Sequence, residues 1–169
     1  MERTLKWILL ICISMPSIVY SLELERDALF RIERNKNANI VQYDAQVTED
    51  GRLYCKEPVV GYWIRLADKG QAQELTWIQN KFAYGFSAKL HKQENTATLD
   101  MVANLGRDIL VRQDGGDYRA VGRIDGVDSY IEKIFIHATG SGTSTKVDYI
   151  DIFGVTVNGH KEQFERFTP

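Results

Sequence analysis

The chain alternates apolar and polar residues with a period of two, and this pattern constrains its fold more than any other feature. From Asn39 to Val47 the odd-numbered positions are mostly apolar, while Gln42, Asp44 and Gln46 are polar. Successive side chains of a β-strand point to opposite faces, so this segment predicts a strand with one buried face. Comparable strand patterns occur at 29–34, 60–66, 84–90, 97–101, 108–113, 118–124, 130–139 and 146–157.

Turn residues separate these segments, and the clearest turn signal is Asn158-Gly159. Both residues tolerate the positive φ of a tight hairpin, which would place Phe153 opposite Phe164. Short strands with frequent turns predict one all-β domain, an antiparallel β-sandwich of about eight to ten strands. The alternative is a lipocalin-like β-barrel, because Gly61-Tyr62-Trp63 resembles the short G-x-W signature of those barrels.

One segment departs from the alternation and predicts a short helix from Gln73 to Ala83. Leu75, Ile78 and Phe82 recur within it at helical spacing, and Gly85 follows as a terminator. These apolar residues predict a helix that packs on the sheet or across one of its ends.

The N-terminus predicts export. Arg3 and Lys6 precede an apolar run from Trp7 to Tyr20, which has the length of a signal-peptide core and is short for a membrane span. We expect a signal peptide over residues 1–21, cleaved after Ser21, and a single mature domain over 22–169 without a stable membrane span. The expected compartment is the periplasm or the cell exterior; an uncleaved anchor is the alternative.

Composition argues against several site classes. The chain has 21 basic and 23 acidic residues, whereas a nucleic-acid binder usually shows a concentrated basic face. His91, His137 and His160 form no closely spaced pair, so no metal site is predicted. Cys55 is the only cysteine beyond the signal segment and has no internal partner for a disulfide. No cofactor is expected.

A surface with aromatic and cationic side chains is the candidate ligand site. If Tyr62 and Ile64 face the core, Trp63 and Arg65 point outward from the same strand. Arg31, Arg34, Lys36 and Asn39 can join this surface if their strands adjoin. The proposed ligand or partner surface comprises Tyr43, Tyr62, Trp63, Arg65, Tyr84, Arg34 and Asn39. It favours a non-catalytic binding or interaction domain for an envelope ligand or protein.

Two other functions remain open. An envelope hydrolase would use Asp44, His137 and Asp151, which are polar residues within otherwise apolar strands. A structural subunit would assemble through an edge strand, although the charged segment 160–167 discourages edge pairing. No catalytic residue is assigned, and an enzyme is the less favoured interpretation.

A family resemblance rests on four segments: RIERNKNANIVQYDAQ, PVVGYWIRL, ELTWIQNKFAYGF and VDYIDIFGVTVNGHKEQF. In order and character they resemble the bacterial proteins grouped as domain of unknown function 4833. The resemblance spans about Phe30 to Glu165, nearly all of the mature chain. It implies a small exported bacterial domain with no assigned activity, and it carries no catalytic residues to this chain.

Overall fold

The computed structural model describes residues 25–103, 105–140, 144–159 and 161–169, so the predicted signal segment lies outside the described residues. The strands are β1 Glu25–Arg34, β2 Asn37–Val47, β3 Val59–Arg65, β4 Gln71–Glu74, β5 Phe86–His91, β6 Thr96–Met101, β7 Ile109–Asp114, β8 Asp117–Ile124, β9 Val127–Thr139, β10 Lys146–Thr156 and β11 Glu162–Phe167. The helical turns are η1 Leu66–Asp68, α1 Trp77–Gln79 and the π-helical turn η2 Asn80–Tyr84.

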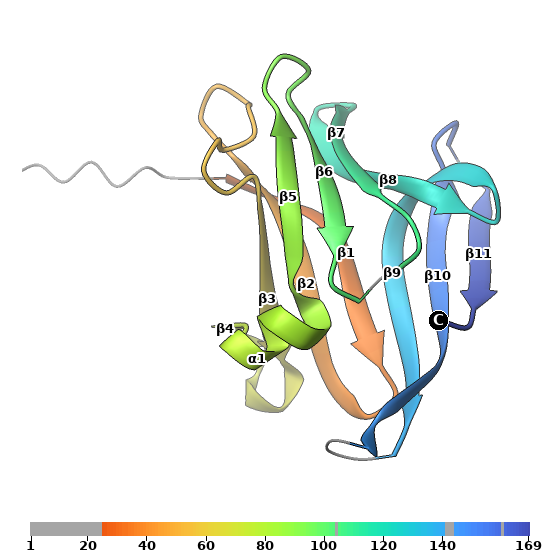
Figure 1. The fold of residues 1–169 in the computed structure, drawn as a ribbon. Helices are drawn as coiled ribbons and strands as arrows, with labels where there is room; N and C mark the ends of the chain where they lie inside the picture. The colour runs from red at the N-terminus through yellow and green to blue at the C-terminus, as the bar shows by residue number, and fades with distance from the viewer. Residues whose placement is uncertain (1–24, 104, 141–143, 160) are drawn as a thin grey trace, which may run out of the picture.

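The described strands form one sheet, in the order β4-β3-β2-β1-β9-β8-β7-β6-β5, with β10 and β11 continuing from β9 (Figure 1). The pairs are antiparallel except for β1 and β9, which run parallel. β9 holds β8 along Val127–Tyr130 and β1 along Lys133–Ile136, while β10 occupies its other edge. The sheet therefore branches at its longest strand.

The sheet folds over so that its two ends face one another across a shared core. The Tyr43 ring on β2 lies 5.7 Å from the Phe86 ring on β5, and the Tyr43 hydroxyl donates a hydrogen bond to the Tyr84 carbonyl at 2.7 Å. β4 and β5 end the sheet without pairing to each other, so it is open. The predicted all-β class is confirmed with eleven strands, and the closed-barrel alternative is wrong.

The predicted inner face of β2 is confirmed, but that of β3 is reversed. Val41 and Tyr43 are buried, and Val41 pairs with Trp63, which is only 6% exposed. Trp63 therefore points into the core, and Tyr62 lies on the opposite face. Gly61 explains the error: a Cβ there would stand 3.1 Å from the Tyr43 ring, so packing keeps a glycine at an inner position and weakens the apolar pattern.

The predicted helix exists but begins later and faces differently. Residues 71–74 form β4, and helical structure runs from Trp77 to Tyr84. Leu75 is buried, whereas Ile78 and Phe82 are 64% and 65% exposed, so the predicted packing face is wrong. Gly85 ends the turn because a Cβ there would lie 1.8 Å from the Asn80 carbonyl oxygen.

Two connections have clear local causes. Phe153 lies opposite Phe164 with ring centroids 5.2 Å apart, which confirms the register predicted from Asn158-Gly159. In the β1–β2 turn, the Asn35 side chain donates to the Ala138 carbonyl and accepts from the Ala138 N–H, extending the β1–β9 pairing. Within the described part of the chain, no helix has the length and apolar character needed to cross a bilayer.

Candidate binding recess

Arg34 ends β1 on the inner face of the sheet. Phe30 and Ile32 occupy the same face and are buried, so the alternation of the strand carries Arg34 inward as well. The Arg34 Cζ atom lies 5.8 Å from the centroid of the Trp63 ring and 5.6 Å from that of Tyr84. The two rings meet edge to face, 5.3 Å apart. The guanidinium thus rests on an aromatic wall at the end of the core.

Two buried nitrogen atoms in this cluster have no hydrogen-bond partner among the described residues: Arg34 Nε and Trp63 Nε1. Both are donors only. Most buried side-chain polar atoms in proteins are hydrogen-bonded, and leaving one unsatisfied costs about 1–3 kcal/mol. The two donors are therefore left unsatisfied by the described residues.

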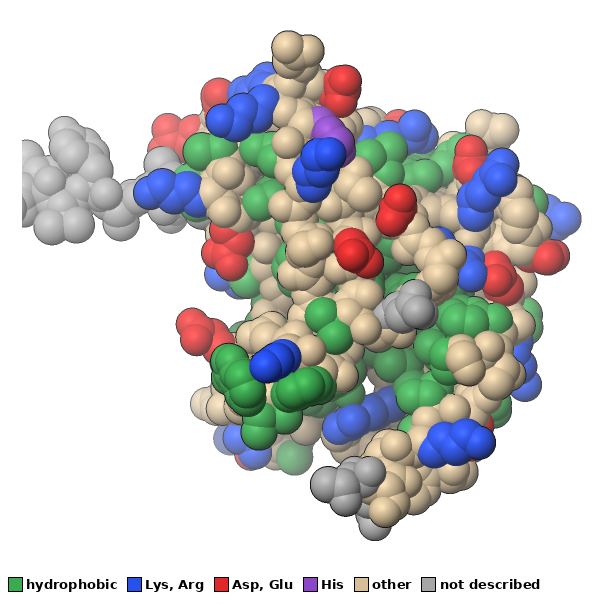
Figure 2. All heavy atoms as spheres, viewed as in Figure 1, with side chains coloured by type: hydrophobic (Ala, Val, Ile, Leu, Met, Phe, Trp, Pro, Cys, Tyr) green, Lys and Arg blue, Asp and Glu red, His purple; other side chains and the backbone are tan. Residues whose placement is uncertain are grey.

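A recess of about 260 Å³ contains both residues. Its other described lining residues come from β2, the end of β3, β4 and the start of the α1 turn: Asn37, Asn39, Arg65, Gln73, Glu74, Thr76 and Gln79. Among the described residues of this lining, Glu74 is the only one with a carboxylate. Figure 2 shows the surface hollowed beside the α1 turn, with a basic side chain in the hollow.

Among the described lining residues, three of the four amide side chains have an oxygen that already accepts a hydrogen bond. Asn37 Oδ1 accepts from the Asn39 N–H, Gln73 Oε1 from Arg65, and Gln79 Oε1 from the Thr76 N–H. These contacts assign the oxygen of each of these three amides to an internal bond and leave its NH₂ group as the remaining donor. The recess is therefore rich in donors as well as cationic.

Tyr84 and Tyr43 anchor the wall from below. Burial raises the pKa of the Tyr84 hydroxyl, and the positive charge of Arg34 partly opposes that increase. Burial also raises the pKa of Tyr43 well above its ordinary value, and the nearby Tyr84 adds to the shift. Both phenols stay neutral at physiological pH, so the Arg34 charge has no anionic partner in this wall.

The predicted surface residues fall into three places. Arg34, Asn39, Trp63 and Arg65 line the recess, and Tyr84 lies against Arg34. Tyr43 is fully buried beneath them and cannot belong to an open surface. Tyr62 lies on the other face of β3, where its hydroxyl donates to Asp44 at 2.6 Å; burial and that bond raise its pKa to about 12. The ligand role itself stays a prediction.

Sequence reasoning missed the polar lining from β4 and the α1 turn. Gln73, Thr76 and Gln79 were assigned to a helix, whereas Gln73 lies on β4 and Thr76 caps α1. The signal for the cap was present: Thr76 and Gln79 have the spacing of a capping box, and the structure contains both of its hydrogen bonds.

The proposed catalytic residues each have a separate structural partner. Asp44 accepts hydrogen bonds from Tyr62 and Gln42, whereas His137 Nδ1 contacts Asp148 at 3.0 Å. Asp151 is held by Arg166 through two hydrogen bonds of 2.6 and 2.7 Å.

His137 and Asp151 are connected through Tyr149 and Arg166, and Asp151 is bound to Arg166 by hydrogen bonds. The Tyr149 ring stacks on the His137 ring with centroids 4.5 Å apart. The Arg166 Cζ atom lies 4.0 Å from the centroid of the Tyr149 ring. Asp44 instead accepts hydrogen bonds from Gln42 on β2 and Tyr62 on β3. These contacts do not connect Asp44 to the other two residues of the predicted hydrolase site.

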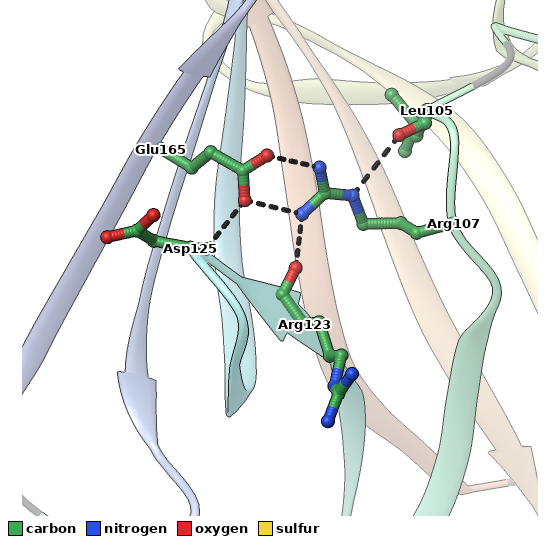
Figure 3. Close-up of polar contacts among 5 residues, drawn as sticks. All are labelled: Leu105, Arg107, Arg123, Asp125 and Glu165. Atoms are coloured by element: carbon green, nitrogen blue, oxygen red, sulfur yellow. Dashed lines mark hydrogen bonds and ion pairs between the residues drawn. The ribbon is translucent and has the colours of Figure 1, made fainter.

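Arg107 contrasts with Arg34 because each of its three guanidinium nitrogens donates a hydrogen bond (Figure 3). It makes two hydrogen bonds to Glu165, of 2.9 and 2.6 Å, and it also donates to the carbonyls of Leu105 and Arg123. Glu165 in turn accepts from the Asp125 N–H. This junction ties β11 to the β6–β7 connection and to the end of β8.

A larger hollow lies elsewhere, a groove of about 1030 Å³ along β1, β9, β10 and β11. None of its described polar side-chain atoms is buried without a partner, so it lacks the chemical signal of the recess. Among the described residues, no group of three or more His, Cys, Asp and Glu side chains could hold a metal ion.

Comparison with known proteins gives a family but no activity. No curated protein and no solved structure matched the chain. A family match covers residues 30–166, which is most of the chain and nearly the same span as the resemblance seen in the sequence. The chain therefore belongs to the family described as Domain of unknown function (DUF4833).

Proposed function

We propose that this domain is a non-catalytic binding module that takes an oxyanion, a carboxylate or a phosphate, into the recess at Arg34 and Trp63. The observation that carries the proposal is the pair of buried, unpartnered N–H donors on two side chains that line one recess. An oxyanion supplies several acceptor lone pairs and a negative charge, and the planar guanidinium matches its geometry.

Electrostatics supports an anion over a neutral ligand. In the described part of the chain, Arg34 has no carboxylate within ion-pair distance, whereas Arg65 is paired with Asp68 at 2.9 Å. The aromatic wall also shields the guanidinium from water on one side, which strengthens a charge-assisted hydrogen bond. Neutral sugars would satisfy the amides but leave the Arg34 charge without a counter-charge.

Nuclear magnetic resonance of nitrogen-labelled protein tests the proposal directly. The probes are glucuronate and glycerol phosphate, with glucose as the neutral comparison. We expect both anions to move the indole N–H signal of Trp63 downfield, because its proton gains an acceptor. The exposed Trp77 indole is the internal reference, since it is 68% exposed and does not line the recess.

Two substitutions isolate the donors. Arg34→Met removes Nε and the charge but keeps the length, and Trp63→Phe removes the indole N–H but keeps an aromatic ring. Each should weaken anion binding by about tenfold or more, as expected for loss of a charge-assisted bond. Backbone amide signals measure the affinity of Trp63→Phe, because this variant lacks the indole signal. Arg31→Met, on the exposed side of the same strand, should bind as wild type. Equal affinity of the Arg34 and Arg31 variants, or no signal change with either anion, rejects the recess as the site.

We also propose that the domain works after export. The support is the basic start and apolar run of residues 1–20, which have the pattern of a signal peptide. Fractionation of the native cell followed by mass measurement tests this. Export with cleavage after Ser21 gives a mature chain that begins at Leu22. A cytoplasmic protein that retains Met1 rejects the proposal.

A further inference from the structure

The turn formed by α1 and η2 carries three large apolar side chains that the fold leaves exposed. Trp77, Ile78 and Phe82 are 68%, 64% and 65% exposed. Together with Lys81 we call them the aromatic knob. Figure 2 shows hydrophobic side chains gathered over α1 with a basic side chain lying on them. Contiguous exposed apolar side chains mark interaction sites in soluble proteins.

The knob is held in shape, so its exposure is a built feature. Thr76 and Gln79 form the capping box at its start, and the close approach of Gly85 to Asn80 fixes its end. Trp77 and Phe82 pack edge to face with ring centroids 6.1 Å apart. Leu75, which precedes the turn, is buried and ties it to the core.

The shape and charge of the knob fit a bilayer surface. Its tips project from a short turn, and none of the three lines the recess or the large groove. The Lys81 ammonium lies 4.9 Å from the Trp77 ring and 5.3 Å from that of Phe82, and it has no ion pair among the described residues. An apolar body with a cationic head suits the boundary between acyl chains and anionic headgroups.

The recess adjoins the knob, because Thr76 and Gln79 line the recess and also begin the turn. A phosphate at the surface of a bilayer that receives Trp77 and Phe82 would therefore lie beside the recess that Arg34 lines. We propose that the knob inserts into an anionic lipid bilayer and that a lipid phosphate occupies the recess. The headgroup half of this proposal rests on the proposed function, whereas the insertion half stands on the knob alone.

Vesicle co-sedimentation tests the insertion. The protein should bind vesicles that contain phosphatidylglycerol and bind pure phosphatidylcholine more weakly, with the difference reduced by salt. The double variant Trp77→Ser with Phe82→Ser should lose about tenfold or more in vesicle affinity. Both positions are exposed, so folding should be retained and is checked by urea unfolding. Val127→Ser, an exposed apolar position on β9, is the matched control.

The outcomes separate the two proposals. Loss of vesicle binding in the knob variant, with glycerol phosphate still moving the Trp63 indole signal, supports insertion by the knob. If Arg34→Met also weakens vesicle binding, the headgroup half is supported; if it does not, that half falls. Absence of vesicle binding by a protein that binds glycerol phosphate overturns membrane docking and leaves the proposed function standing. Knob-dependent dimerisation without vesicle binding also overturns it.

Discussion

Arg34 and Arg107 are both partly enclosed arginines that lie against aromatic rings, Phe167 in the case of Arg107, yet their hydrogen-bond partners differ in kind. Arg107 is enclosed by a carboxylate and two carbonyls, and its ion pair with Glu165 leaves the two side chains 15% and 24% exposed. Arg34 has two aromatic rings for neighbours and keeps a buried Nε without an acceptor. The first arrangement is complete within the fold, and the second awaits an acceptor. Under the proposed function, the comparison separates an arginine that stabilises the domain from one that binds an anion.

The largest expected effect comes from breaking the complete arrangement. Glu165→Ala removes both bonds to Arg107 and the acceptor for the Asp125 N–H. We expect the free energy of unfolding to fall by about 2–3 kcal/mol, since a largely buried cation loses its partner. Urea unfolding measures it, with the exposed Glu132→Ala as control. If Glu165→Ala lowers the free energy of unfolding no more than Glu132→Ala does, Arg107 and its ion pair do not stabilise the domain.

A smaller effect should appear with pH. The Arg107 guanidinium holds the pKa of Glu165 below its ordinary value of 4.5. Because the pKa is lower in the folded protein, this carboxylate contributes stability above its unfolded pKa and loses it as pH falls through the folded value. Glu165→Gln should therefore flatten the acid limb of the stability curve between neutral pH and the acid range. Parallel curves for the two proteins would contradict this assignment.

Arg34→Met should change stability less than Glu165→Ala does. The substitution leaves no carboxylate without its partner. It removes contacts with two rings and one unsatisfied donor, so the free energy of unfolding should change by no more than about 1 kcal/mol. The measurement is the same urea series. A loss above about 2 kcal/mol would show that Arg34 is a structural residue.

The smallest effect concerns Tyr84, which reports the Arg34 charge. In the unsubstituted protein, the positive charge of Arg34 opposes the effect of burial on the pKa of the Tyr84 hydroxyl. Arg34→Met removes that charge, so it should raise this pKa further. Carbon-labelled tyrosine spectra measure the titration, and Tyr84→Phe assigns the signal. An unchanged pKa would mean that solvent screens the guanidinium from this phenol.

The sequence predicts the strands well because alternation is a local property. β2 was identified with its inner face correct, and the β10–β11 register followed from Asn158-Gly159. The face of β3 was reversed because Gly61 is kept small by Tyr43, a residue from another strand. The helical turn was located, but its apolar face was assumed to be buried.

The recess was predicted in part. Arg34, Asn39, Trp63 and Arg65 were grouped from their residue types and do line it, but as the end of the core instead of an open sheet surface. Arg34 follows Phe30 and Ile32 at intervals of two residues, so the alternation of the strand would have placed it on their inner face. The unpartnered donors depend on how β1, β3 and the α1 turn converge, and no local pattern contains that information.

The parallel pairing of β1 with β9 has a consequence for how the domain is made. Arg31 lies beside Lys133, about a hundred residues downstream, so the first strand waits for one of its neighbours until most of the chain has left the ribosome. Such distant pairings raise contact order and slow folding to the order of milliseconds to seconds. A nascent chain that stops short of β9 leaves one edge of β1 without its native neighbour.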